Sequence, residues 1–301
     1  MPFLGELAAL STAVLWSLTS LFFTSASRRI GSYWLNKIRI LFAAILLGIT
    51  LFLTTGHLLP PGITSRSYIL LILSGIIGLS MGDACLFQAY VIIGPRLSLL
   101  IFTVWPIIAA VTAWIFLGES LGFQAIIGIL ITVAGMVWVT AERNTNGNQI
   151  SHSERKRIKL GIILALGGAA GQAIGLVLAK AGMGDTLLPL PATFIRMLAA
   201  VVAIWLFGIV RGDLRDFKSK FADKRAVLLA FGGAIVGPFL GVWMSLVAVQ
   251  HTKTGVAAAI MSTVPVLVIP LVIIFYKEKV SPRAIIGAVI TVAGVALLFL
   301  R

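Results

Sequence analysis

The stretch Ala125–Gly135, AIIGILITVAG, recurs as Ala284–Gly294, AIIGAVITVAG, with nine of eleven residues identical at an offset of 159 positions. The same offset relates further residues that break or pack helices: Pro106 and Pro265, Glu119 and Glu278, Gly78 and Gly237, Gly82 and Gly241, and Ala89 and Ala248. Self-similarity at a constant offset identifies copies of one structural unit. The chain is therefore predicted to contain two copies of the same unit.

The composition is that of an integral membrane protein. Of the 301 residues, 59% are apolar and 11% are charged, and the mean hydropathy is +1.06. Soluble domains are about 45–50% apolar and about 25% charged. The net charge of +14 would suggest a nucleic-acid partner in a soluble protein, but the basic residues lie in short segments between apolar runs. That distribution is typical of cytoplasmic loops, so the lipid bilayer is the expected partner and nucleic acid is not.

Ten apolar runs approach the length of about 20 residues that a spanning helix needs. They cover Leu7–Ala26, Trp34–Thr55, Ser67–Ile93, Leu97–Gly118, Ser120–Ala141, Leu160–Met183, Leu187–Val210, Ala226–Gln250, Thr254–Tyr276 and Ala284–Leu300. The polar stretch 142–159 has no apolar periodicity and is predicted to be a linker that holds the halves together loosely. The chain then divides into a first five-helix repeat at 1–141, this linker, and a second five-helix repeat at 160–301.

The odd number of spans in each repeat decides how the repeats are oriented. After five crossings the chain has changed sides, so the second repeat enters the membrane upside down relative to the first. We therefore expect an all-α integral membrane protein with ten transmembrane helices in two inverted five-helix repeats. A pseudo-two-fold axis in the membrane plane would relate them.

In this doubled order the sequence resembles the drug/metabolite transporter superfamily, in its EamA-type branch of ten helices and two repeats. The resemblance is carried by the paired prolines, the paired ITVAG stretches, Gly118-Glu119 with its counterpart Glu278, and the Ile-Arg steps at Arg39 and Arg196. It extends over nearly the whole chain, from Leu4 to Leu300. It implies a secondary transporter of small organic solutes, an exporter of amino acids or related metabolites. We expect such a protein to work by alternating access, in which the two repeats rock about a site at the midplane.

Two pairs of glycines are predicted to mark helix–helix contacts. Gly78 and Gly82 share one helix face, as do Gly237 and Gly241 in the second repeat. No hydrophobic force draws helices together in lipid, so small residues that let backbones approach closely mark the contact surface.

The paired prolines and glutamates lie at predicted bends and turns. Pro106 and Pro265 fall about ten residues into their runs, where proline removes a backbone donor and kinks the helix. Each bend is either static or a hinge whose freed carbonyl groups face a cavity. Glu119 and Glu278 lie in very short turns, where a carboxylate is expected to accept N–H bonds at a helix N-terminus.

Polar side chains inside the apolar runs are the candidate binding residues, because a polar group at that depth is costly and usually faces a cavity or a partner. Asp83 is the one acid far from a run end, and its repeat counterpart is Val242, so the fold itself does not require it. It shares a helix face with Ser80, Phe87 and Tyr90. The predicted substrate-binding residues are Trp16, Arg39, Asp83, Gln88, Gln172, Arg196 and Trp243.

The basic residues Arg39, Lys180 and Arg196 give the interior a positive excess, which suits carboxylates or zwitterions. In an inverted repeat, Arg39 and Arg196 are expected near opposite membrane faces, with Asp83 on the side of Arg39. We therefore predict an ion pair between Asp83 and Arg39, with Arg196 left for an anionic group of the substrate. On the side of Arg196 and Lys180, we expect only Glu6 to balance the charge.

Two other functions compete with this interpretation. Asp83 also suits a channel or a proton-coupled multidrug or organic-cation efflux transporter, and competition by amino acids against quaternary amines would separate the two. The stretch 78–82, GLSMG, matches the nucleophile elbow of an intramembrane hydrolase. That motif needs a strand–turn–helix context, which a hydrophobic helix does not provide, so the chain is not expected to be an enzyme.

No cofactor or metal site is expected. The chain has one cysteine, Cys85, and its histidines, His57, His152 and His251, have no ligand spacing. It has no nucleotide-binding motif, so the energy source is expected to be an ion or solute gradient, with a proton as the candidate coupling ion. The sequence leaves the oligomeric state open.

The distribution of basic residues predicts the orientation in the cell membrane. With Arg39, Lys180 and Arg196 set aside, 18 of the remaining 21 lie on the side of the loops after the first, third, fifth, seventh and ninth runs. Since basic residues are enriched on the cytoplasmic side, both termini are predicted to lie outside the cytoplasm. The family resemblance implies cytoplasmic termini, and in this respect the chain departs from it.

Overall fold

The computed structural model describes residues 3–59, 62–140, 152–276 and 281–299. Within these ranges all regular elements are helical, and ten stretches are long and apolar enough to span a membrane. They are Leu4–Ile30, Ser32–Thr55, Ser65–Gly94, Leu97–Leu117, Phe123–Thr140, Lys156–Met183, Pro189–Arg211, Lys224–His251, Thr254–Leu271 and Pro282–Phe299. The predicted all-α membrane class with ten spans is confirmed.

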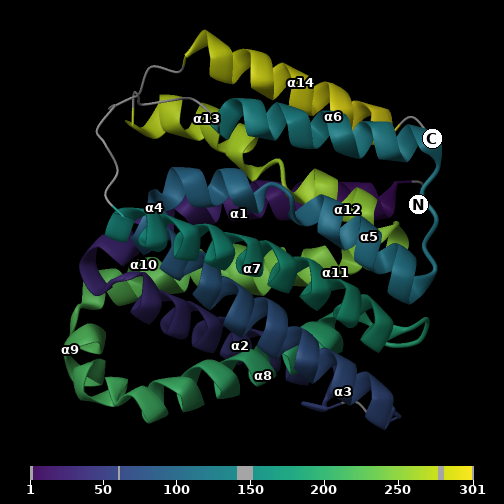
Figure 1. Cartoon of the computed structure of the whole chain (residues 1–301). Coiled ribbons are helices and arrows are strands. Elements are labelled where there is room, and N and C mark those ends of the chain that lie inside the picture. Colours follow the sequence, from purple (N-terminus) through teal and green to yellow (C-terminus); the bar gives the residue numbers. More distant parts are fainter. Residues whose placement is uncertain (1–2, 60–61, 141–151, 277–280, 300–301) are drawn as a thin grey trace.

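Several spans contain more than one helix. The α-helices are α1 (Leu4–Ile30), α2 (Ser32–Thr55), α3 (Ser65–Ser74), α4 (Asp83–Phe102), α5 (Trp105–Leu117), α6 (Phe123–Thr140), α7 (His152–Met183), α8 (Pro189–Arg211), α9 (Phe217–Ala222), α10 (Lys224–Ala234), α11 (Val242–His251), α12 (Thr254–Met261), α13 (Val264–Tyr276) and α14 (Pro282–Phe299). Two segments are π-helical, η1 (Gly75–Gly82) and η3 (Ile235–Gly241), and η2 (Asp213–Asp216) is a short 3-10 helix. Both ends of the chain lie at one end of the bundle (Figure 1), with the rings of Phe3 and Phe299 6.0 Å apart.

The duplicated stretch packs against its own copy. One copy lies in α6 and the other in α14, and these helices lie side by side (Figure 1). A Cβ on Gly294 would lie 2.5 Å from the backbone nitrogen of Thr132, and one on Gly135 would lie 2.5 Å from that of Thr291. The contact is reciprocal, since Thr132 is equivalent to Thr291 and Gly135 to Gly294. The outer contacts, Gly128 with Leu298 and Gly287 with Val139, show that the two copies run antiparallel.

The predicted packing glycines of the first repeat contact the first helix of the second repeat. Gly78 and Gly82 lie in η1, against Gly175 and Gly171 of α7. A Cβ on Gly175 would lie 2.7 Å from Gly78 Cα, and one on Gly171 would lie 2.8 Å from Gly82 Cα. Backbones at this separation leave no room for a side chain.

The glycines of the second repeat make the corresponding contact with α1. A Cβ on Gly237 would lie 2.7 Å from Thr19 Oγ1, and one on Gly241 would lie 3.1 Å from Trp16 Nε1. The first helix of each repeat thus packs against the third span of the other. The repeats interlock through these contacts, so their association does not depend on the polar stretch between them.

The spans that carry Pro106 and Pro265 are broken into two helices, whereas the sequence predicted a kink inside one. The breaks take residues 103–104 and 262–263, and each proline is the second residue of the next helix. A proline in the first turn leaves no extra group unbonded, because backbone N–H groups there have no helical partner. Hydroxyl groups bond the carbonyls before the breaks: Thr103 Oγ1 to Leu100 O at 2.6 Å, and Ser262 Oγ to Ala259 O at 2.7 Å.

The two π-helical segments occupy equivalent places in the third span of each repeat. An offset of 159 carries residues 76–82 of η1 onto 235–241 of η3. A π-helix contains an extra residue per turn and is frequent at functional sites. The GLSMG stretch lies entirely within η1 and therefore lacks the strand–turn–helix context of a nucleophile elbow. Directly after η1 comes Asp83, the first residue of α4.

The predicted linker is partly helical. α7 begins at His152, so residues 152–159 of the predicted stretch 142–159 belong to a helix. Glu, Arg and Lys in this segment are good helix formers, although they show no apolar periodicity. The remaining part, 142–151, and the predicted capping residue Glu278 lie outside the described residues.

Candidate functional site

Arg39 is held inside the bundle by two side chains. It lies in α2 and is 3% exposed. Its Nε donates to Asn36 Oδ1 at 2.8 Å, and its Nη2 donates to Asp83 Oδ2. The predicted ion pair between Asp83 and Arg39 is therefore present. Sequence reasoning missed Asn36, although its spacing of three residues from Arg39 places both on one helix face.

Three aromatic rings surround the Arg39 guanidinium. Its central carbon lies 5.7 Å from the ring centroid of Trp16, 5.5 Å from that of Phe23 and 5.4 Å from that of Phe87. Cation–π attraction is strongest where the cation is desolvated, so the rings and the ion pair together fix the position of Arg39. Phe23 was not predicted as a site residue. The sequence feature that could have revealed it is its spacing of seven residues from Trp16, which puts both on one face of α1.

Asp83 is paired with Arg39 and is also attracted by a second arginine. Its side chain is 19% exposed, compared with 4% for that of Arg39. Arg196 of α8 also attracts the Asp83 carboxylate electrostatically. We call Arg39, Asp83 and Arg196 the central charge group. With two guanidinium groups and one carboxylate, it carries an excess positive charge.

Part of the Arg196 guanidinium has no protein partner among the described residues. The residue is 3% exposed, and its Nε and Nη1 donate no hydrogen bond to any described group. The main chain of Arg196 is tightly packed on η1, since a Cβ on Gly75 would lie 2.1 Å from Arg196 O. Its Nη2 lies 3.7 Å from where a Cβ on Gly78 would be. A buried charge without full hydrogen bonding is costly, so an acceptor at Nε or at Nη1 would satisfy a real deficit.

The two arginines occupy equivalent positions along their helices, as the repeat predicts, and Asp83 attracts both electrostatically. Each arginine is seven residues past the start of its helix, about 10 Å along an axis of about 35 Å. Each therefore lies within about 7 Å of the middle of its helix. Because α2 and α8 pack against each other, one carboxylate can serve both.

The other predicted binding residues are placed differently. Trp243 lies 6.1 Å from the ring of Phe239 and packs, like Trp16, against the buried residues of α2 and α8. Gln172 of α7 is half-buried at the contact with Gly82, which is the residue before Asp83. Gln88 is exposed on the side of α4 that also carries Val91, so the structure does not bring it to the central charge group.

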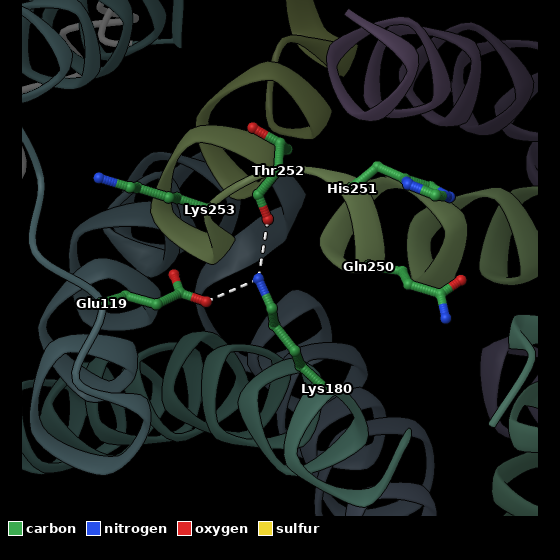
Figure 2. Close-up of a pocket in the computed structure, with 6 residues that line it drawn as sticks. All are labelled: Glu119, Lys180, Gln250, His251, Thr252 and Lys253. Atoms are coloured by element: carbon green, nitrogen blue, oxygen red, sulfur yellow. Dashed lines mark hydrogen bonds and ion pairs between the residues drawn. The ribbon is translucent and has the colours of Figure 1, made fainter. Parts of the chain in front are cut away.

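A second polar site lies at the end of the molecule that holds both termini. A cleft of about 370 Å³ is lined by Glu119, Lys180, Gln250, His251, Thr252 and Lys253 (Figure 2). Lys180 Nζ lies 2.7 Å from Glu119 Oε1 and donates to Thr252 O at 2.8 Å. The expectation that only Glu6 balances Lys180 was wrong. Glu119 does so, while Glu6 accepts a hydrogen bond of 2.8 Å from Thr252 Oγ1.

Glu119 also caps a helix, as expected for a carboxylate in a short turn. It accepts a bond of 2.7 Å from the backbone N–H of Thr254, the first residue of α12, and one of 3.0 Å from the Thr254 hydroxyl. The capped helix belongs to the other repeat, which the sequence did not indicate. Glu119 thereby ties the loop after α5 to both α7 and α12.

At the opposite end, Lys37 and Asp213 join α2 to the segment after α8. The Lys37 side chain is fully buried, and its Nζ lies 3.3 Å from Asp213 Oδ2. Tyr33 donates its hydroxyl to the same oxygen at 2.7 Å. The hydrogen bond from Tyr33, with a smaller contribution from Lys37, holds the pKa of Asp213 below its usual range. Sequence reasoning placed Lys37 near the start of the second apolar run and missed this group, for which the neighbouring Tyr33 and Trp34 were the signal.

Comparisons with known proteins agree with this architecture. The sequence matches the EamA-like transporter family twice, over residues 3–141 and 159–300. An uncharacterized transporter of Clostridium kluyveri is 29% identical over 147 residues. That alignment covers 49% of this chain and 47% of the relative, so it spans about half the length of each. A protein of known crystal structure has the same fold, with a TM-score of 0.75 and 19% identity over 99% of this chain and 96% of that one.

Proposed function

The chain belongs to the EamA-like transporter family, and on that premise we propose that it is a secondary transporter that exports small organic metabolites carrying a carboxylate, such as amino acids. The ten membrane-spanning helices and the transporter-named relative support transport rather than enzymatic turnover. In this proposal the solute binds beside the central charge group, with Trp16, Trp243 and Gln172 at its border.

The observation that carries the proposal is the state of Arg196. Its guanidinium is buried, yet Nε and Nη1 lack a hydrogen-bond partner among the described residues. A carboxylate is the planar acceptor that matches a guanidinium fork, which pairs Nη2 with either Nε or Nη1. Arg196 is therefore the proposed receptor for the anionic end of the solute, while Arg39 already has a carboxylate, that of Asp83.

The same geometry argues against an organic cation as the solute. A cation carrier needs a membrane-embedded acid that is available to the cation. Asp83 is instead bound to Arg39 and attracted by Arg196. A cation at this place would meet an excess of positive charge in a medium of low dielectric constant, so the efflux of organic cations is less well supported.

Alternating access is supported by the way the repeats meet. The reciprocal antiparallel contact of α6 with α14 is what inverted repeats would produce, because equivalent residues of two copies exchange the same contact. The breaks before Pro106 and Pro265 supply places where helices can pivot. In this proposal the two repeats move against each other around the central charge group, and a gradient of solute or of an ion supplies the energy.

The cell membrane is the proposed location, with both termini outside the cytoplasm. The charge distribution of the sequence carries this part of the proposal. The end of the bundle with both termini then faces outward, together with the cleft between Glu119 and Lys180. The end with Lys37 and Asp213 faces the cytoplasm.

The test is solute binding by the purified protein in detergent. Binding to the folded state raises the unfolding temperature, so amino acids and other metabolites can be screened by thermal shift. We expect carboxylate-bearing solutes to stabilise the wild-type protein and Arg196→Gln to abolish their effect. Arg211→Gln, at the exposed end of the same helix, is the matched control and should respond like the wild type. Stabilisation by quaternary amines, or an undiminished response of Arg196→Gln, would contradict the proposal.

A further inference from the structure

We infer that Asp83 links the binding of the solute's carboxylate to the binding of one proton. The inference rests on the proposed function, because it takes Arg196 as the receptor for that carboxylate. Ionised Asp83 attracts Arg196 and repels a second carboxylate beside it. A proton on Asp83 removes both effects, so each of the solute and the proton binds more tightly when the other is bound. Export together with a proton is then driven by the outward gradient of the solute.

The contacts of the Arg39–Asp83 ion pair show which of the two side chains is less restrained. Arg39 is held by Asn36 and by three aromatic rings, and only 4% of its side chain is exposed. The Asp83 side chain is 19% exposed. Asp83 is therefore the more accessible member of the pair, and the Arg39 guanidinium is the more restrained one.

The count of charges shows why a proton is needed. The empty site holds two guanidinium groups and one carboxylate. A bound solute adds a second carboxylate next to the first, and two carboxylates that share a site favour a proton on one of them. Asp83 accepts a hydrogen bond from Arg39. A carboxylate bound at Arg196 weakens the attraction between Arg196 and Asp83, so only the Arg39 guanidinium still stabilises the ionised form of Asp83. By thermodynamic reciprocity, a protonated Asp83 then strengthens the binding of the solute to the same extent.

Asp83 is the member of the central charge group that can lose its charge by binding a proton. The charged and titratable groups that act on it are Arg39 of α2, Arg196 of α8 and Tyr90 of α4. Arginine stays protonated in proteins, and tyrosine ordinarily titrates near pH 10. Along the end of η1 and the start of α4, α7 supplies Gly167–Gln172. None of these titrates.

The backbone gives Asp83 a way to move once it is protonated. Asp83 directly follows the π-helical segment η1. Shifting the extra residue of a π-helix past a position rotates that position by roughly 100° about the helix axis. A protonated Asp83 no longer forms an ion pair with Arg39, so the electrostatic restraint on such a rotation is gone. In the second repeat Val242 follows η3, so the linkage belongs to the first repeat.

The experiment measures the binding of propionate to the purified wild-type protein by calorimetry between pH 5.5 and pH 8. Propionamide serves as the uncharged analogue. For one linked proton, the Kd for propionate should rise with pH by up to about tenfold per unit. In a weakly buffered solution, propionate should also draw protons from the solvent into the protein. Propionamide should show neither effect.

Variants assign the linkage to Asp83. Asp83→Asn should bind propionate more tightly than the wild type at pH 8, with a Kd that does not depend on pH and without proton uptake. Asp185→Asn, which removes an exposed carboxylate after α7, is the matched control and should keep the pH dependence of the wild type. If Asp83→Asn does not fold, proton uptake by the wild-type protein still decides the matter.

The outcomes separate the inference from the proposed function. If the wild type binds propionate with a Kd independent of pH and without proton uptake, the linkage is refuted while the carboxylate site stands. The same holds if Asp83→Asn retains the pH dependence. If neither the wild type nor Asp83→Asn binds propionate at any pH, the carboxylate site itself is refuted.

Discussion

Arg39 and Asp83, 44 positions apart in the sequence, form an ion pair that joins α2 to the start of α4. Removing one partner of a buried pair leaves an uncompensated charge and costs roughly 3–5 kcal/mol. We expect Asp83→Asn to lower the free energy of unfolding by an amount of this order. Adding Arg39→Gln should then restore part of the loss, because the unpaired guanidinium is gone.

A double-mutant cycle of denaturant unfolding in detergent measures this coupling. Arg196→Gln serves as the comparison. It removes a guanidinium that lacks partners for two nitrogens, so it should leave stability nearly intact. Strictly additive losses for the Asp83 and Arg39 changes would show that the contact contributes nothing to stability.

The reciprocal contact between α6 and α14 should not tolerate a methyl group. Gly294→Ala would place its Cβ 2.5 Å from the backbone nitrogen and hydroxyl of Thr132. Overpacking of this kind typically costs about 1–3 kcal/mol, so the unfolding temperature should fall. Gly122→Ala is the control, since nothing lies within 4 Å of its Cβ. Equal unfolding temperatures for the two variants would show that the helices can separate at no cost.

The contacts between the first helix of one repeat and the third span of the other should fail when glycine becomes leucine. Gly82→Leu would insert a side chain against α7, and Gly241→Leu would insert one against Trp16 of α1. Both variants should express less protein and unfold at lower temperature than the wild type. Size-exclusion profiles with thermal unfolding provide the measurement. Normal folding and solute binding by either variant would mean that its contact is dispensable.

The Lys37–Asp213 contact predicts an acid-sensitive end of the bundle. The pKa of Asp213 is lowered chiefly by the hydrogen bond from Tyr33, so its ionised form stabilises the fold. That contribution is complete above the unfolded pKa of about 3.9 and is lost as the pH falls through the lower folded value. Asp213→Asn should therefore unfold at lower temperature than the wild type at pH 7, and the difference should shrink below pH 4. Asp216→Asn, exposed on the same segment, should behave like the wild type throughout.

A reporter at the C-terminus tests the orientation. If both termini lie outside the cytoplasm, a fluorescent protein that matures only in the cytoplasm should stay dark when fused after Arg301. Alkaline phosphatase fused at the same place should be active. A fluorescent C-terminal fusion would reverse the orientation, and the cleft at Glu119 and Lys180 would then face the cytoplasm.

Contacts between side chains of one repeat were easier to predict than contacts between repeats. Asp83 and Arg39 were paired correctly, because both are charges inside apolar helices and only a few acids were available. The partner of Lys180 was predicted wrongly. Glu119 lies in a turn, and only the packing of α7 against α5 and α12 brings that turn to Lys180. The same reasoning missed the Lys37–Asp213 contact, which joins α2 to a segment more than 170 positions away.

Composition, run length and internal repetition were enough to predict the membrane class, the ten spans, the duplication and the identity of the charges inside the bundle. These follow from local properties, since each span is recognised by its own apolar length and each copy by its own residues. The packing of the helices was needed to show that the duplicated stretches contact each other, that the spans with Pro106 and Pro265 are broken, and that Arg196 attracts Asp83 as well. Helices in lipid are arranged by close backbone contact and by hydrogen bonds between distant segments. The glycines of one helix indicate that a contact exists, but the period and composition of that helix do not identify the partner segment.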